Sequence, residues 1–141
     1  MNVKQVIIIR STYPDGKGGL RKIRRGKEIS QCCHASMAFL THRIRQNWGY
    51  KIDDTLFSLA EMEWIRTNFR KIVLVCNSQE ELLAIESAAK DAKIVAELIT
   101  DSGLTEFHGV PTMTALALGP DEDEKIDAIT GPEGKFPLKL Y

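Results

Sequence analysis

Two short runs of consecutive apolar residues constrain the fold of this chain most strongly. They are Val6-Ile7-Ile8-Ile9 and Ile72-Val73-Leu74-Val75. Runs of this length and β-branched content are typical of strands that are buried on both faces of a sheet. Because segments with helical periodicity separate and follow them, the pattern predicts an α/β fold with helices on both faces of the sheet.

Strands and helices are expected to alternate along the rest of the chain. The expected strands are 4–10, 71–76, 96–100 and 112–118, and the expected helices are 27–46, 55–67, 78–91 and 122–130. Such alternation favours parallel neighbours, so we expect one domain over residues 1–141 with a mixed, mostly parallel four-stranded sheet. Residues 11–25 are expected to form a long basic loop, and residues 132–141 a C-terminal tail.

Composition limits the classes of function. The 141 residues carry no net charge, and no apolar run approaches the ~20 residues that span a bilayer. The N-terminus lacks the layout of a signal peptide. Three cysteines, two of them adjacent, fit a reducing compartment better than a disulfide framework. We therefore expect a cytoplasmic protein without a membrane partner.

The zero net charge conceals a division between the two halves of the chain. Residues 1–71 carry 14 Lys and Arg against 6 Asp and Glu, whereas residues 72–141 carry 5 against 13. The basic side chains gather just before the first long helix, at Lys17, Arg21, Lys22, Arg24, Arg25 and Lys27. A cluster of this density indicates a polyanion partner, and we expect nucleic acid. The alternative is a dipolar surface with no partner.

The first long helix presents two stripes of side chains. Lys27, Gln31 and His34 are spaced i, i+4 and i+7 and therefore share one face. A second stripe is expected to face the core and contains Ile29, Cys33, Ser36, Met37, Leu40 and Ile44. A lysine in the first turn of a helix is unfavourable by ~0.3–1 kcal/mol, but it suits an anionic partner such as a phosphate or a developing oxyanion. The spacing alone still favours an ordinary solvated surface.

A second candidate segment begins at Asp101, directly after a predicted strand. Gly103 and several hydroxyl side chains follow it. A carboxylate there can hold a water molecule or accept a hydrogen bond from a lysine, although a turn in which Asp101 caps backbone amides is the alternative. Because ligands of α/β sheets bind at the carboxyl ends of strands, we expect Asp101, Lys27 and the basic loop to converge.

Other chemistries find little support. The run Cys32-Cys33-His34 lacks the Cys-x-x-Cys pairing of zinc sites, so we expect neither a metal nor another cofactor. Cys33 and His34 are a candidate nucleophile and base, but Cys33 is expected on the core stripe, where buried thiols are inert. The sequence contains no P-loop, no Gly-x-Ser-x-Gly and no dinucleotide fingerprint.

An ordered set of motifs resembles the archaeal and eukaryotic type of peptidyl-tRNA hydrolase, the second structural class of that enzyme. The motifs are Arg10 at the end of a strand, Gly26-Lys27-Glu28-Ile29-Ser30-Gln31-Cys32-Cys33-His34-Ala35, Leu98-Ile99-Thr100-Asp101-Ser102-Gly103-Leu104-Thr105, Thr112 and Thr114, Gly119-Pro120, and Thr130-Gly131. They cover nearly the whole chain. The loop between Arg10 and Gly26 is longer and more basic than the family pattern, and Ser30 stands where the pattern has alanine.

The resemblance implies hydrolysis of the ester that joins a peptide to the 3′ ribose of tRNA. It implies an oxyanion- or phosphate-binding role for Lys27, a water-positioning or water-activating role for Asp101, and orienting roles for Gln31, Thr105 and Thr114. His34 would be catalytic or structural. It also implies a homodimer, no metal, and a tRNA backbone that follows the basic cluster. Two alternatives stay open: a non-catalytic tRNA-binding paralogue, and an unrelated small α/β hydrolase that uses Cys33 and His34.

Overall fold

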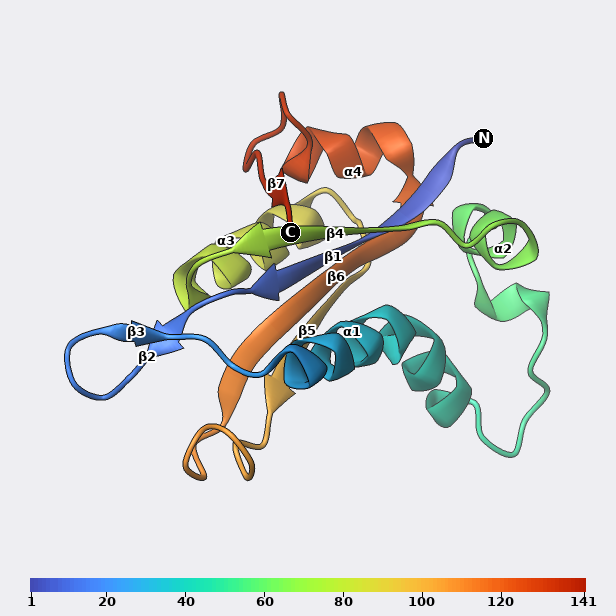
Figure 1. Cartoon of the computed structure of the whole chain (residues 1–141). Helices are drawn as coiled ribbons and strands as arrows, with labels where there is room; N and C mark the ends of the chain where they lie inside the picture. The colour runs from blue at the N-terminus through green and yellow to red at the C-terminus, as the bar shows by residue number, and fades with distance from the viewer.

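The central strand of the sheet is β1 (Val3–Arg10), all eight residues of which are buried. The computed structural model describes all 141 residues (Figure 1). Side chains alternate between the two faces of β1, as they do in any strand. Val6 and Ile8 pack in a large cluster with residues of the later helices, whereas Ile7 and Ile9 pack against Ala35 of the first helix. The first apolar run is therefore buried on both faces, as its composition predicts.

The remaining elements follow in order along the chain. They are β2 (Tyr13–Pro14), β3 (Leu20–Arg21), α1 (Arg25–Gln46), a 3-10 turn (Asp54–Leu56), α2 (Leu59–Arg66), β4 (Lys71–Cys76), α3 (Gln79–Asp91), β5 (Ala96–Asp101), β6 (Thr112–Glu122), α4 (Asp123–Thr130) and β7 (Lys139–Leu140). The helix expected from residue 55 begins only at Leu59. Ser58 and Glu61 form a capping box that fixes this start.

The sheet differs from the expected one in size and direction. It has five strands in the order β5-β6-β1-β4-β7, and only β1 and β4 pair in parallel. The prediction of a mostly parallel four-stranded sheet is therefore wrong. The reason is that β6 inserts between β1 and β5 and runs antiparallel to both. Strands β1, β4 and β5 still point the same way, so their carboxyl ends share one end of the sheet.

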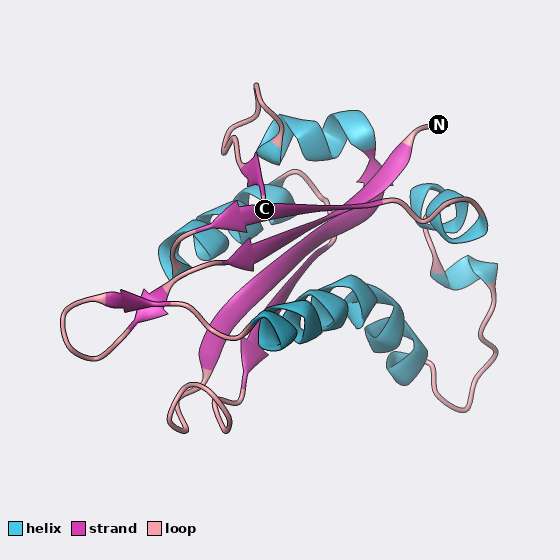
Figure 2. Ribbon diagram, in the orientation of Figure 1, coloured by secondary structure: helices cyan, strands magenta, loops and turns pink.

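Helices cover both faces of the sheet, as predicted. In the view of Figure 2, α3 and α4 lie on one side of the sheet, and α1 and α2 lie on the other. Leu82 and Ile85 of α3 and Ile126 and Ile129 of α4 belong to the larger core cluster. Phe39 of α1 and Trp64 of α2 pack edge to face, with ring centroids 5.9 Å apart, in a smaller one.

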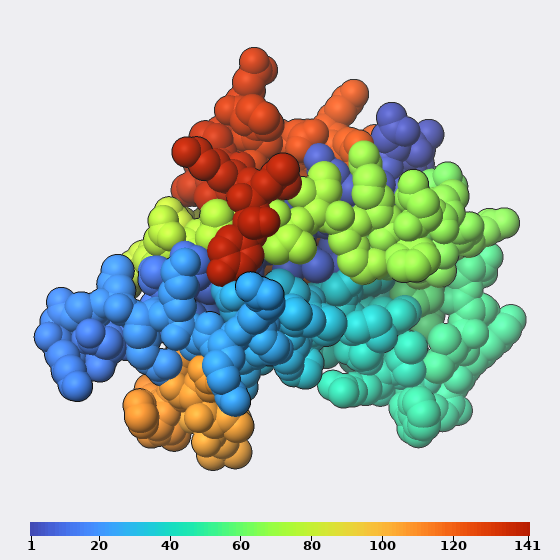
Figure 3. All heavy atoms as spheres, viewed as in Figure 1, coloured from blue at the N-terminus to red at the C-terminus, as the bar shows by residue number.

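Two segments without expected structure form short strands. Within the basic loop 11–25, β2 and β3 pair as a small antiparallel hairpin that projects beyond the end of the main sheet (Figure 1). In the tail, β7 pairs with β4 and becomes the fifth strand of the sheet. The tail then ends against α1, as the space-filling view shows (Figure 3), where the Tyr141 hydroxyl donates to Glu28 Oε2 at 2.6 Å.

The inward face of α1 is not the one that the apolar stripe predicts. Gln31, Ala35, Ser36, Ala38 and Phe39 are buried, whereas the side chains expected in the core are largely outside it. Among that stripe, Ile29 and Met37 are 57% and 51% exposed, and Cys33 is exposed. Small residues face the sheet because α1 packs closely on Ala115 and Ala117 of β6. The larger apolar side chains of α1 are left beside a surface groove.

None of the helices combines the length and the apolar character that crossing a membrane requires.

Candidate active site

Lys27 and Asp101 meet at the carboxyl end of the sheet. Lys27 lies in the first turn of α1, and Asp101 is the last residue of β5. Lys27 Nζ donates to Asp101 Oδ1 at 2.8 Å and to Thr105 Oγ1 at 3.0 Å. The Lys27 and Asp101 side chains are only 16% and 11% exposed. The contact joins residues 74 positions apart, so the predicted convergence of these two segments is confirmed.

Gln31 and Thr114 extend the same network into the protein interior. Gln31 is 1% exposed and Thr114 is fully buried. The Thr114 hydroxyl donates to Gln31 Oε1 at 2.5 Å, and Gln31 Nε2 faces Asp101 Oδ1 at 3.4 Å. A buried amide needs partners for both of its ends. Gln31 thus lies on the buried side of α1, where its amide links Thr114 to Asp101.

The second oxygen of Asp101 is held by the backbone. Gly103 N–H donates to Asp101 Oδ2 at 2.9 Å. Burial by itself raises the pKa of Asp101, but the hydrogen bond from Lys27, the Gly103 amide and the Lys27 charge outweigh it, so the pKa lies below the ordinary carboxyl value. The carboxylate is therefore ionised at neutral pH. Asp101 thus caps a backbone amide and contacts the lysine at the same time, so the two interpretations of Asp101 hold together.

The loop from residue 102 to residue 111 folds back on itself beside the site. Gly109 N–H donates to Gly103 O at 2.8 Å. Gly103 has a φ of +85°, and a Cβ there would lie 2.2 Å from the Val110 carbonyl oxygen. Only glycine satisfies both conditions. The glycine after Asp101 therefore allows the close approach that shapes this loop.

His34 stands apart from the other predicted site residues. Its side chain is exposed, and Nε2 lies 3.5 Å from Ser30 Oγ, at the limit of a hydrogen bond. His34 lies one turn beyond Gln31, and it forms no hydrogen bond with Lys27 or Asp101, although its charge contributes to lowering the pKa of Asp101. The neighbouring Cys33 lies on the groove side of α1. The structure therefore brings together five of the six predicted catalytic side chains, namely Lys27, Gln31, Asp101, Thr105 and Thr114.

The basic cluster divides into free and engaged side chains. Lys17, Lys22 and Arg25 are exposed and their charged groups contact no carboxylate. Arg21 instead donates to the Glu106 carbonyl oxygen, and Arg24 pairs with the Glu106 carboxylate. The hydrogen bond from Arg24 holds the pKa of Glu106 below its ordinary value. Sequence reasoning missed the role of Glu106, because a single loop glutamate belongs to no periodic pattern.

Nothing in the site resembles a metal centre, since no three His, Cys, Asp or Glu side chains gather anywhere in the chain. The first turn of α1 has no side-chain cap at Arg24. Its free N–H groups, the Lys27 ammonium and the nearby basic side chains make this end of the sheet electropositive and suited to an anion. The site therefore combines a partly buried ion pair, hydroxyl and amide donors, and a basic border.

A large apolar groove lies elsewhere, on the opposite side of α1. Its volume is about 850 Å³, and Ile7, Ile29, Cys33, Met37 and Val73 contribute to its apolar lining. Lys27, Gln31 and Asp101 are absent from it. The polar network identifies the candidate active site better than the size of the hollow does, because catalysis depends on convergent polar groups.

Comparisons with known proteins agree with the motifs. The family model described as Peptidyl-tRNA hydrolase PTH2 matches residues 3–137. The chain is similar to a peptidyl-tRNA hydrolase of Nanoarchaeum equitans, with 40% identity over 139 residues and 99% of each chain covered. It is also similar to a peptidyl-tRNA hydrolase of Methanopyrus kandleri, with 37% identity over 129 residues, 91% of this chain and 93% of the relative. A probable peptidyl-tRNA hydrolase 2 of Dictyostelium discoideum is 33% identical over 138 residues, which are 98% of this chain and 54% of that protein. With a matching model over nearly its whole length, the chain belongs to the peptidyl-tRNA hydrolase PTH2 family.

Proposed function

We propose that this chain hydrolyses the ester bond between a peptide, or an N-blocked amino acid, and the 3′ ribose of tRNA. The observation that carries the proposal is the contact of Lys27 Nζ with Asp101 and Thr105 at the electropositive end of the sheet. Family membership supports the same reaction. Ester hydrolysis needs a site for the developing oxyanion and a positioned water molecule, and these residues are able to supply both.

Lys27 is the proposed electrostatic group. An ammonium has three N–H donors, and Asp101 and Thr105 take two of those on Lys27. The third is free for the oxyanion of the tetrahedral intermediate or for the terminal phosphate. Holding the donor in place before the substrate arrives lowers the reorganisation needed in the transition state.

Asp101 is proposed to hold Lys27 and orient the attacking water. A carboxylate with a lowered pKa is a weak base. Positioning of water by an accepting oxygen is therefore the better role for Asp101 than full proton abstraction. Gln31 and Thr114 orient the carboxylate from inside, and Thr105 orients the ammonium from outside. His34 is assigned no direct role in this scheme.

The tRNA backbone is proposed to follow the free basic side chains at the border of the site. Lys17 lies in the β2–β3 hairpin and Lys22 follows β3, whereas Arg25 begins α1 and also lines the edge of the apolar groove. Contacts of this kind are electrostatic and weaken with salt. The alternative, a non-catalytic tRNA-binding protein, would use the same surface without turnover.

Incubation of the purified chain with N-acetyl-aminoacyl-tRNA tests the proposal. We expect release of the acetylated amino acid, and a fall in kcat of about 10²–10³-fold in Lys27→Ala. Asp101→Asn should also lose activity, whereas Cys33→Ala should retain it. Binding of the tRNA without release by the wild-type chain would favour the non-catalytic alternative. Inactivation by a thiol reagent, reproduced by loss of activity in Cys33→Ala, would favour a cysteine hydrolase.

We further propose that the chain forms a homodimer and acts in the cytoplasm, where peptidyl-tRNA arises during translation. Ile29 and Met37 expose apolar surface along α1, and contiguous exposed apolar surface is typical of protein–protein contacts. Sedimentation equilibrium over a range of protein concentrations distinguishes a dimer from a monomer. A single species of about one chain mass at every concentration would contradict the dimer.

A further inference from the structure

The two loops that border the active site are packed together by a small aromatic cluster. Tyr13, Ile23 and Phe107 are buried in a core cluster of their own. The rings of Tyr13 and Phe107 lie 4.9 Å apart between centroids. Arg10 lies over Tyr13 at 4.5 Å, and Arg21 lies over Phe107 at 5.4 Å. The segment from 11 to 25 and the loop from 102 to 111 are thereby joined through side chains.

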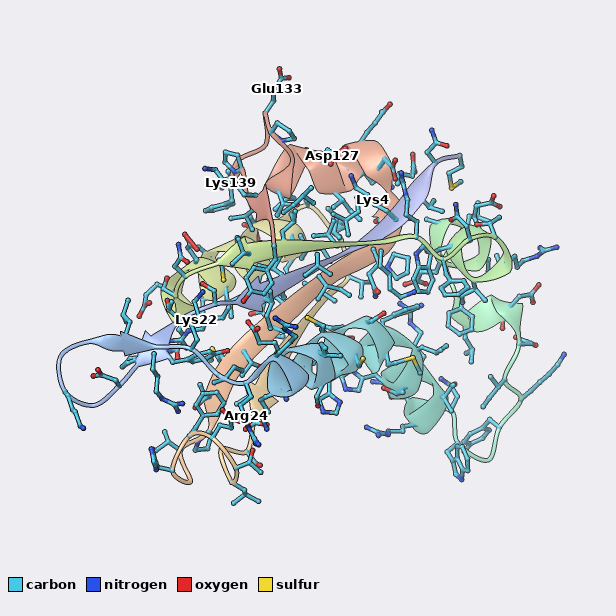
Figure 4. The ribbon with its side chains drawn as sticks, viewed as in Figure 1. Lys4, Lys22, Arg24, Asp127, Glu133 and Lys139 are labelled. Atoms are coloured by element: carbon cyan, nitrogen blue, oxygen red, sulfur yellow. The ribbon has the colours of Figure 1, made fainter.

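Glu106 adds an ionic contact to this junction. Its carboxylate pairs with Arg24, and its carbonyl oxygen accepts from Arg21. Figure 4 shows Arg24 at the start of α1, next to the loop between β5 and β6. The Glu106 side chain is 9% exposed and that of Arg24 is 79% exposed. The Glu106 carboxylate forms no other salt bridge, so breaking this contact leaves it without a charged partner.

Glu106 directly follows Thr105, whose hydroxyl lies 3.0 Å from Lys27 Nζ. The loop has its own hydrogen bond between Gly109 and Gly103, but Leu104 and Thr105 are exposed. The two residues that follow Thr105 are anchored by the Arg24 and Arg21 contacts of Glu106 and by the packing of Phe107.

We propose that Glu106 and Phe107 are positioning residues for catalysis. Arg24 and Arg21 hold them in place, and we call these four residues the latch. The two arginines therefore bind the loop rather than the tRNA backbone. The inference rests on the proposed function for its kinetic tests. Misplacement of a catalytic group by about 1 Å can cost a large factor in rate. Weakening the latch should therefore lower kcat, whereas removing a free cation such as Lys22 should raise KM.

Steady-state kinetics on N-acetyl-aminoacyl-tRNA separates these effects. Glu106→Gln should lower kcat by about tenfold with KM unchanged. Lys22→Gln should raise KM and leave kcat as it is, because it loses a charge outside the latch. The double variant Arg24→Glu with Glu106→Arg restores an ion pair without changing the net charge, and it should recover most of kcat. An unchanged kcat in Glu106→Gln, or no recovery in the exchanged pair, would overturn the proposal.

A double-mutant cycle tests the route through Thr105. If Glu106 acts by placing the Thr105 hydroxyl, Glu106→Gln should cost little further in a Thr105→Val background. Multiplicative losses in kcat would mean that Glu106 acts by another route and would reject the latch. Because Phe107→Ala can destabilise the fold, Phe107→Leu is the variant for the aromatic contact.

A measurement without substrate keeps the latch testable if the wild-type chain releases no amino acid. The ¹H–¹⁵N resonances of the Lys27 ammonium should shift in Glu106→Gln, because Thr105 is one of its hydrogen-bond partners. They should stay in place in Glu133→Gln, whose side chain lies in the distant tail (Figure 4). Absence of turnover alone would remove the proposed function, whereas unmoved resonances in Glu106→Gln would remove the latch.

Discussion

Thr114 determines which way the Gln31 amide lies. Its hydroxyl donates to Gln31 Oε1 at 2.5 Å, so the amide nitrogen is turned toward Asp101. Both side chains are buried. A strand residue in the interior therefore controls a hydrogen bond to the carboxylate that contacts Lys27.

Replacement of Thr114 by valine should show how much the Thr114–Gln31 hydrogen bond contributes to stability and to kcat. The change leaves the buried Gln31 oxygen without its donor, and we expect a loss of about 1–3 kcal/mol in the free energy of unfolding. Urea denaturation measures this loss, and kcat should fall in the same variant. Thr114→Ser keeps the hydroxyl and serves as the control, so an equal fall in kcat for both variants would argue against the hydrogen bond.

Stability should depend on the ionisation of Asp101 in acid. Because the folded-state pKa of Asp101 is lowered, its carboxylate contributes stability above the unfolded pKa of about 3.9. That contribution disappears as the pH falls through the folded-state pKa. Urea unfolding between about pH 3 and pH 7 should show a flatter profile in Asp101→Asn than in the wild-type chain. Identical profiles would show that Asp101 titrates normally.

Binding of tRNA should lose part of its salt dependence when the free cations are removed. The triple variant Lys17→Gln, Lys22→Gln and Arg25→Gln should reduce the slope of log K against log salt by about 2 to 3. Lys90→Gln with Lys93→Gln and Lys135→Gln removes the same charge elsewhere. A slope that falls equally in both triple variants would mean that net charge, rather than this surface, governs binding.

A methyl group at position 103 should disturb the loop beside the site. Gly103→Ala places its Cβ 2.2 Å from the Val110 carbonyl oxygen at a φ of +85°. We expect kcat to fall and the free energy of unfolding to drop by about 1–3 kcal/mol. Gly109→Ala is the matched control, since Gly109 has a similar φ of +78° but open space around its Cβ position. Equal effects in both variants would assign the cost to backbone conformation alone.

The sequence was informative about elements and about the polar site, but less so about sheet order. Local patterns identified β1, β4 and the end of β5 because strand content is a local property. They could not place β6 between β1 and β5, since that pairing joins residues more than 100 positions apart, as in Val6 and Leu118. The prediction that Asp101 and Lys27 meet is still correct, because β1 and β5 point the same way.

The wrong prediction of which face of α1 is buried has a clear physical cause. Hydrophobic periodicity favours large apolar side chains for the inward face, whereas this helix faces the sheet with Ala35, Ala38 and Gln31. Close approach to Ala115 and Ala117 requires small residues there. Gln31 is buried because Thr114 satisfies it, and no single-sequence pattern reveals such a partner 83 positions away.

Cys33 is exposed and therefore suitable for selective labelling. Cys76 is buried, and burial raises the pKa values of Cys32 and Cys76 to about 11. Thiolates react and thiols do not, so a maleimide dye at neutral pH should attach selectively to Cys33. A spectroscopic reporter can thus be carried by the same helix as Lys27 without any engineered cysteine.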